Sequence, residues 1–272
     1  MNRFRRRFLL LLSVGAASFL IVSPAASQQA VSKIPISPGL SFEYFSRTVS
    51  WDPDPTTKED RYSSRLQSLL GLLHLDYEIR NGSLVGVLFG YSLADFNGLI
   101  FRQLPFSIDY QAGNIGGVLV GADLGQDLIS SGYVEIKAMA QFVIYLGSTK
   151  NLEVTTLNAE GSLAAKPDDW MRVQIGPVVS YRGFEYFSPF LSVAYNKLWG
   201  KFTMTETIGD LKGSEEKKVS SKSIIGISLG TKFEPSPNFS LKAEGTLLPF
   251  KKGANQGWGF DWGGALHATF SF

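Results

Sequence analysis

Residues Trp258–Phe272 read WGFDWGGALHATFSF and decide the fold. The small or polar residues share one parity and include Asp261 and His267. The apolar and aromatic residues share the other parity: Trp258, Phe260, Trp262, Leu266, Ala268, Phe270 and Phe272. This alternation predicts a β-strand with one apolar face. Such a face at an open edge is an aggregation hazard in a soluble protein, but a barrel closed in lipid has no edge and turns the face to acyl chains. The stretch therefore predicts the closing strand of a transmembrane β-barrel.

The same two-residue period runs back along the chain to Leu40 and predicts an all-β, antiparallel, up-and-down barrel. Twelve strands are expected, because such single-chain barrels have an even number of strands, with short turns at one end and longer loops at the other. The count depends on residues 99–111, whose alternation is poor, so ten strands is the alternative. The predicted strands are 40–50, 65–80, 83–93, 99–111, 115–124, 133–146, 152–165, 170–182, 189–204, 222–234, 239–249 and 258–272.

Residues 1–27 predict a cleaved signal peptide. A basic run, Arg5–Arg7, precedes the apolar run Phe8–Val22, which is too short and wrongly flanked for a spanning helix. The basic run also fits a twin-arginine signal, but a barrel must reach its membrane unfolded, which favours the general export route. Residues 28–39 then predict a short periplasmic leader and 40–272 an outer-membrane barrel of a Gram-negative cell envelope.

Composition excludes several classes of function. The chain has 26 basic and 24 acidic residues, but four of the basic residues and none of the acidic ones lie in the signal peptide. The mature chain is therefore slightly acidic, and its charge gives no argument for nucleic acid as a partner. The absence of cysteine excludes disulfides, thiolate metal sites and thiol catalysis. No phosphate-binding loop or zinc-binding spacing is present, so no cofactor and no metal is expected.

Alternation alone does not separate a membrane barrel from a soluble one, because a soluble barrel alternates with the opposite sense. The export signal, the unequal turn lengths and the aromatic residues at strand ends favour the membrane. Phe260 and Phe270 are ten residues apart, which projects to about 25 Å at a tilt near 40° and matches the apolar band between two aromatic girdles. The predicted girdle and insertion-signal residues are Trp258, Phe260, Trp262, Phe270 and Phe272.

Charged and polar residues on the inward parity are candidates for the lumen lining. Lys232, Glu234, Lys242 and Glu244 share the inward face of one predicted hairpin, where diagonal neighbours have opposite signs. They predict a lattice of mutually paired charges that fills the lumen; the alternative is a selectivity region of a pore. The full set of candidates is His74, Asp76, Glu78, Arg80, Glu135, Lys137, Arg172, Arg182, Lys232, Glu234, Lys242, Glu244, Asp261 and His267.

Three stretches carry a resemblance to a known family: SPFLSVAY at 188–195, NFSLKAEGTL at 238–247, and the closing strand. They resemble small outer-membrane β-barrel proteins of the opacity, OmpA-like and porin-like type, over roughly residues 170–272. The resemblance implies outer-membrane lipid as surroundings and recognition of Phe270 and Phe272 by the barrel-insertion machinery. The family's usual glycine five residues before the end is His267 here, so the match to that signal is partial.

The expected function is porin-like passage of small polar solutes. The first alternative is a non-conducting structural or adhesin-like barrel that binds ligands with its outer loops, predicted at 51–64 and 205–221. A barrel enzyme acting on lipid is the third hypothesis. No catalytic residue is predicted, because His74 and His267 have no inward serine at a telling spacing.

Overall fold

The computed structural model describes residues 36–51, 62–79, 82–106, 108–110, 113–156, 159–253 and 256–271. The predicted signal peptide lies outside these residues, as do Arg80, Phe272 and most of the predicted loop 51–64. The described part of the chain holds no helix long and apolar enough to cross a membrane. The strands are β1 (Ile36–Trp51), β2 (Ser63–Ile79), β3 (Ser83–Asn97), β4 (Leu99–Phe101), β5 (Ile108–Tyr110), β6 (Ile115–Ser131), β7 (Val134–Gly147), β8 (Lys150–Thr156), β9 (Ala159–Tyr181), β10 (Phe187–Ile208), β11 (Leu211–Ser221), β12 (Ile225–Ser236), β13 (Phe239–Gly253) and β14 (Gln256–Phe270).

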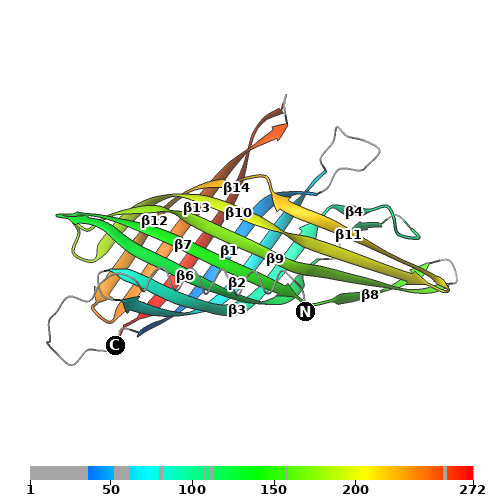
Figure 1. The fold of residues 1–272 in the computed structure, drawn as a ribbon, viewed down its shortest axis with the longest axis horizontal. Coiled ribbons are helices and arrows are strands. Elements are labelled where there is room, and N and C mark those ends of the chain that lie inside the picture. Colours follow the sequence, from blue (N-terminus) through cyan, green and yellow to red (C-terminus); the bar gives the residue numbers. More distant parts are fainter. Residues whose placement is uncertain are drawn as a thin grey trace, which may run out of the picture. The chain divides into compact units, whose positions relative to one another are not determined.

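Ten of these strands close into a ring by antiparallel pairing of sequence neighbours (Figure 1). The ring runs β1-β2-β3-β6-β7-β9-β10-β12-β13-β14, and β14 returns to β1. The strands β4, β5, β8 and β11 lie outside this ring. The all-β, antiparallel barrel is confirmed, and the ring has the alternative count of ten strands.

The prediction of a wall strand at residues 99–111 is wrong. This stretch holds a separate two-stranded hairpin, in which β4 pairs with β5 and with no strand of the ring. Its alternation is poor because Leu99, Phe101 and Tyr110 are all buried, as expected of a hairpin packed on a core and not of a barrel wall.

Two further predictions from the sequence differ from the structure. The predicted strands 152–165 and 170–182 become β8 and one continuous strand, β9. The predicted outer loop 205–221 contains β11, which pairs with the end of β10. In both cases a hairpin extends the barrel where the sequence predicted a wall strand or a loop.

The two ends of the barrel differ. At one end, here named the turn end, short turns join the strands, such as those at Gly132 and Pro237–Asn238. Gly132 has a φ of 57°, which favours glycine in a tight turn. At the other end, the loop end, lie the β4–β5 hairpin, β8 and β11. The unequal turn lengths that the sequence predicted are therefore present in the described residues.

The strands that form the barrel wall differ between the two ends. Toward the turn end β10 pairs with β12 and β1 pairs with β14, whereas toward the loop end both β10 and β1 pair with β11. The three strands β12, β13 and β14 are thereby replaced by β11, so the described wall narrows from ten strands to eight. Figure 1 shows the far tip of β13 and β14 standing clear of the neighbouring strands. The barrel is therefore wide at its turn end and narrow at its loop end.

The two halves also have opposite inside–outside patterns, as β2 shows. In the turn half Leu73 and Leu75 point outward and are exposed, while His74 points inward. In the loop half Arg65 points outward and Leu66 is completely buried inside. An apolar exterior with a polar interior is the arrangement of a membrane-spanning barrel. The loop half instead has the apolar core and polar exterior of a soluble protein.

Aromatic side chains surround the turn end. Contacting ring pairs join neighbouring strands there: Tyr133–Tyr181, Phe187–Phe233 and Phe239–Phe270. Such a row is typical of the girdle at a membrane interface. Of the girdle residues predicted from the sequence, Trp258, Phe260, Trp262 and Phe270 all point outward and are exposed.

Candidate functional site

A polar cavity of about 290 Å³ lies inside the wide half of the barrel. Seven predicted lumen residues line it: His74, Asp76, Arg172, Lys232, Lys242, Glu244 and His267. Other lining residues were not singled out from the sequence, among them Glu43, Asp123 and Asn196. Asp123 and Glu43 stand on the inward parity of the predicted strands 115–124 and 40–50, so the alternation rule could have found them.

The other predicted lumen residues lie elsewhere. Glu135 is buried near the turn end, where it accepts a hydrogen bond from Arg182 at 2.6 Å. Lys137 lies nearby, with its Nζ 3.0 Å from Asp127 and 3.5 Å from Glu135. Glu78 and Glu234 are exposed. These residues therefore sit at the rim of the turn end and not in the cavity.

The charges of the β12–β13 hairpin pair along each strand. Lys232 lies 2.7 Å from Glu234, and Lys242 lies 2.7 Å from Glu244. The register places Lys232 directly opposite Lys242. Each lysine is thus neutralised by the acid two residues away on its own strand. The predicted charges do satisfy one another, but not by the cross-strand pairing that the sequence suggested.

A buried ion pair links strands across the interior of the barrel. The Arg172 guanidinium on β9 donates to Glu43 on β1 at 2.8 Å and to Gln141 on β7 at 2.6 Å. Because Glu43 and Arg172 are 129 residues apart in the chain, the pair links distant strands across the interior. Gln141 gives the guanidinium a second acceptor, whereas the Arg172 Nε is buried without a hydrogen-bond partner among the described residues.

Asp261 holds the place where the wall exchanges strands, named here the junction. Its carboxylate accepts hydrogen bonds from the Thr48 backbone N–H at 2.8 Å and from the Ser223 hydroxyl at 2.7 Å. Arg47 lies 3.9 Å from the same carboxylate and also donates to Asn196 at 2.9 Å. Asp261 is 0% exposed. These side chains come from β1, β10, β14 and the β11–β12 connection. Their hydrogen bonds replace backbone pairing at the place where β1 changes partner from β14 to β11.

An apolar plug fills the narrow half of the barrel. It is formed by Phe96, Phe101, Tyr110, Trp170 and Phe202, all of which are almost completely buried. The Phe202 ring contacts the rings of Phe96, Phe101 and Tyr110 at centroid distances of 5.1 to 5.9 Å. An eight-stranded barrel is just wide enough for side chains to fill, which agrees with the narrowing of the wall at this level.

The β4–β5 hairpin is fixed over this plug by two carboxylates. The Gln103 backbone N–H donates to Glu215 on β11 at 2.8 Å, and the Phe106 N–H donates to Glu206 on β10 at 3.0 Å. Both carboxylates are buried. The hairpin is therefore a part of the closed loop end and not a freely exposed loop.

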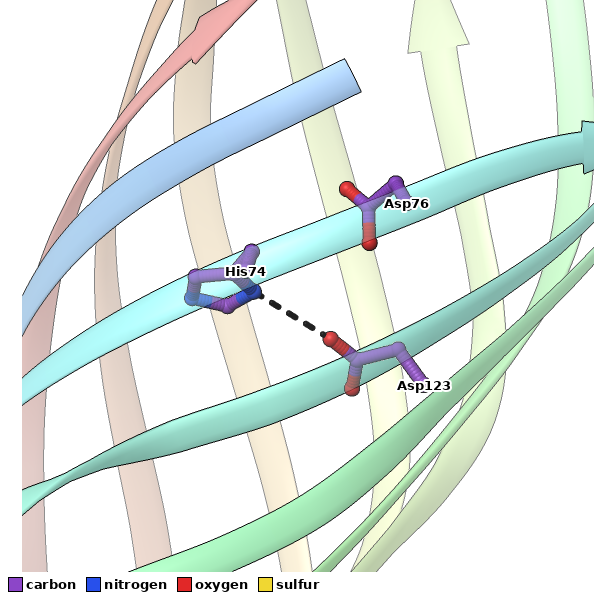
Figure 2. A group of neighbouring side chains, drawn as sticks. All are labelled: His74, Asp76 and Asp123. Carbon is purple, nitrogen blue, oxygen red and sulfur yellow. Dashed lines mark ion pairs between the residues drawn. The ribbon is translucent and has the colours of Figure 1, made fainter. Parts of the chain in front are cut away.

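His74, Asp76 and Asp123 form a compact group on the cavity wall (Figure 2). One nitrogen or oxygen atom from each lies within 4.8 Å of the others, a grouping of the kind that holds metal ions. His74 Nδ1 lies 3.5 Å from Asp123 Oδ2, and His74 Nε2 lies 2.5 Å from Ser41 Oγ. The edge of the His267 ring faces His74, with the ring centroids 5.7 Å apart.

Ser41, His74 and Asp123 are connected in the order of a hydrolytic triad, since the imidazole contacts the hydroxyl with one nitrogen and the carboxylate with the other. No serine stands at a telling spacing from a histidine in the sequence, because Ser41 reaches His74 from the adjacent strand β1, 33 residues away. Its side chain, however, is 0% exposed and is not part of the cavity lining. A substrate in the cavity has no access to the hydroxyl, so the group lacks the exposed nucleophile that acyl transfer needs.

No protein-family model matches the chain, and no curated protein matches its sequence. Among solved structures, the outer membrane protease OmpT from Escherichia coli is similar, with 11% identity over 90% of this chain and 100% of that chain and a TM-score of 0.46. The transport unit of the E. coli autotransporter AIDA-I has 13% identity, covers 96% and 98% of the two chains and has a TM-score of 0.42. The Pseudomonas putida toluene transporter TodX has 8% identity over 89% and 90%, with a TM-score of 0.37.

Proposed function

We propose that this protein is an outer-membrane barrel that does not conduct solutes and that serves as an interaction or structural module. The observation that carries the proposal is the apolar plug in the narrow half. Trp170 is 2% exposed, and its ring stacks on Tyr145 with the centroids 3.4 Å apart. Protein interiors packed in this way leave few voids larger than a water molecule, so the plug separates the polar cavity from the loop end.

The exterior supports location in the outer membrane. A closed barrel with an apolar outer face satisfies its backbone internally, as lipid requires. In such proteins the short turns face the periplasm and the longer loops face outward, so the loop end is the external face. The partners of the wide half are outer-membrane lipid and, through Phe270 and Phe272, the insertion machinery.

The external face is built of paired strands. Beyond the plug β8 pairs with β9, β9 with β10, and β10 with β11, so four strands form one continuous extension. Figure 1 shows β8 and β11 beside the far ends of β9 and β10. Binding residues are often carried on connections that a rigid scaffold positions. The extension offers such a scaffold for a partner outside the cell.

Catalysis is not part of the proposed function, because Ser41 is buried behind His74. Porin-like passage is the weaker candidate. It is favoured by the polar cavity, but it requires that the plug open.

Recording from planar lipid bilayers tests the closed lumen. We expect no discrete conductance steps across many insertions of the purified barrel, because the plug leaves no continuous aqueous path. Insertion is verified independently by the shift in gel migration that a folded barrel shows on boiling. Reproducible unitary steps from the wild-type chain would contradict the proposal and favour porin-like passage.

Cysteine labelling tests which end is external, and the absence of native cysteine leaves no background reaction. Asp210→Cys places a thiol in the tight turn between β10 and β11, and Asn238→Cys places one in a turn at the other end. We expect a membrane-impermeant maleimide to modify the first variant on intact cells and the second only after the outer membrane is opened. Equal labelling of both variants on intact cells, or the reverse pattern, would show that the orientation is wrong.

A further inference from the structure

We propose that His74, Asp76 and Asp123 bind one divalent transition-metal cation inside the barrel, with Zn²⁺ as the representative ion. Imidazole and carboxylate groups together are ligands that suit Zn²⁺ and related cations. Mg²⁺ and Ca²⁺ prefer oxygen ligands only, so the histidine favours the transition metals. The site lies in the wide half, so the inference holds whether or not the barrel conducts.

The separation of the ligand atoms fits this class of ion. Bonds of about 2.0–2.2 Å in a tetrahedral site place neighbouring ligand atoms about 3.4 Å apart. His74 Nδ1 and Asp123 Oδ2 are 3.5 Å apart, which is longer than a typical N–H···O hydrogen bond of about 2.9 Å. The ligand atoms of the whole group lie within 4.8 Å of one another, so a side-chain movement of at most about 1.4 Å brings the third ligand to the tetrahedral spacing. The cavity leaves room for water in a fourth position.

Ser41 fixes the imidazole in the orientation that a metal requires. With Nε2–H donating to the Ser41 hydroxyl, 2.5 Å away, the lone pair of Nδ1 points toward the two carboxylates. The His74 side chain is only 10% exposed, so its orientation is set by packing and by this contact. Histidines that ligate metals usually donate their other ring N–H to such an acceptor. The contact that resembles half of a hydrolytic triad therefore serves the metal site equally well.

Gly86 lets the two carboxylates meet. The register places Asp76 on β2 opposite Gly86 on β3, and Gly86 opposite Asp123 on β6. A Cβ at Gly86 would collide with Asp76 Oδ1 and press on Asp123 Cβ. The glycine thus removes the side chain that would otherwise stand between two like charges, which the wall brings together across β3.

Among the described residues, neither carboxylate of the group forms an ion pair with an arginine or a lysine. Asp76 Oδ1 is buried and has no hydrogen-bond partner there. The arginines and lysines that line the cavity are already paired, each with a different carboxylate: Arg172 with Glu43, Lys242 with Glu244, Lys232 with Glu234, and Arg47 with Asp261. Buried charges normally have partners or coordinate metals, and two facing carboxylates with one histidine leave a negative charge that a divalent cation balances.

Isothermal titration of the refolded full barrel with Zn²⁺, without a histidine tag, tests the site. We expect one Zn²⁺ per chain and loss of saturable binding in His74→Gln and Asp76→Asn. Ser41→Ala keeps all three ligands but removes the group that orients the histidine, so we expect its affinity to fall about 10- to 100-fold. Asp127→Asn is the control, because it removes a carboxylate that pairs with Lys137 at the rim of the turn end, outside the cavity, and it should bind as the wild type does.

Folding of each variant is checked by heat-modifiable gel migration. Should His74→Gln fail to fold, Asp76→Asn decides the question, because Asp76 Oδ1 makes no hydrogen bond to lose. Three results would overturn the site: no Zn²⁺ binding by the wild type, unchanged binding in Asp76→Asn, or equal loss in Asp127→Asn. The last would identify the binding as adventitious attraction to lumen charge.

Discussion

Asp261→Ala is expected to cost about 3–5 kcal/mol of the free energy of unfolding, the range for breaking a buried ion pair by removing one partner. The variant leaves the Arg47 guanidinium buried with only Asn196 and the Ser223 carbonyl as acceptors. It also leaves the Thr48 backbone N–H without its acceptor, because the edge of β1 opposite β2 has no strand partner at Thr48, between the end of the β14 pairing and the start of the β11 pairing. Urea titration of the barrel refolded into lipid vesicles, followed by tryptophan fluorescence, measures the loss.

The control for this prediction is Glu234→Ala, which removes one partner of an ion pair with side chains 44% and 46% exposed. Exposed pairs contribute about 0–1 kcal/mol, so this variant should unfold nearly as the wild type does. Replacing both buried partners, Arg47→Met with Asp261→Leu, should recover part of the loss, because no uncompensated charge remains. A cost for Asp261→Ala no greater than that of Glu234→Ala would show that the junction does not depend on its ion pair.

Leu73→Arg is expected to destabilise the barrel in lipid by about 2–4 kcal/mol, the cost of arginine on the lipid face near the middle of the bilayer. Leu73 is 62% exposed on β2, with Leu69 and Tyr77 at equal distances on the same outward face. Its exposure therefore reflects contact with acyl chains. The same vesicle titration measures the change.

Gln67→Arg is the matched control on the same strand and the same face. Gln67 lies in the loop half, where the outward residues are polar, so arginine there should change the free energy of unfolding by at most about 0.5 kcal/mol. Equal effects of the two variants would contradict the proposed position of the apolar band. An opposite order would place the membrane at the loop half.

The sequence predicted the fold class well because alternation on the lipid face is local. It predicted the loop half poorly because the apolar residues change from the outward face to the inward face within single strands. On β2 the run Leu69–Leu73 is apolar on both faces, where the lipid-facing pattern of Leu73 and Leu75 overlaps the core pattern of Leu66 and Leu70. The lipid-facing pattern by itself does not indicate the core, so the sequence prediction omitted it. Once a plug is recognised, the poor alternation of the β4–β5 hairpin has its explanation.

The candidate site could be predicted only in part. His74 and Asp76 were found because they share an inward face on one strand. Asp123 enters the group through strand register across Gly86, and Ser41 through the pairing of β1 with β2. Those registers are relations between strands, which the alternation within a single strand does not give. The role of Asp261 depends on a change of strand partners that no local pattern encodes, so the sequence placed it in the lumen lining and not at the junction.

The exchange of strands at β11 separates the closure of the barrel into two events. The narrow ring joins β1 to β11 and needs no residue beyond Ser221, whereas the wide ring needs the final strand to meet the first. The N-terminal strand is therefore held from two directions, by a strand from late in the chain and by the last one. The narrow ring is thus complete in the chain before β12, β13 and β14, and Asp261 of β14 joins the two closures at the junction once the last strand is in place.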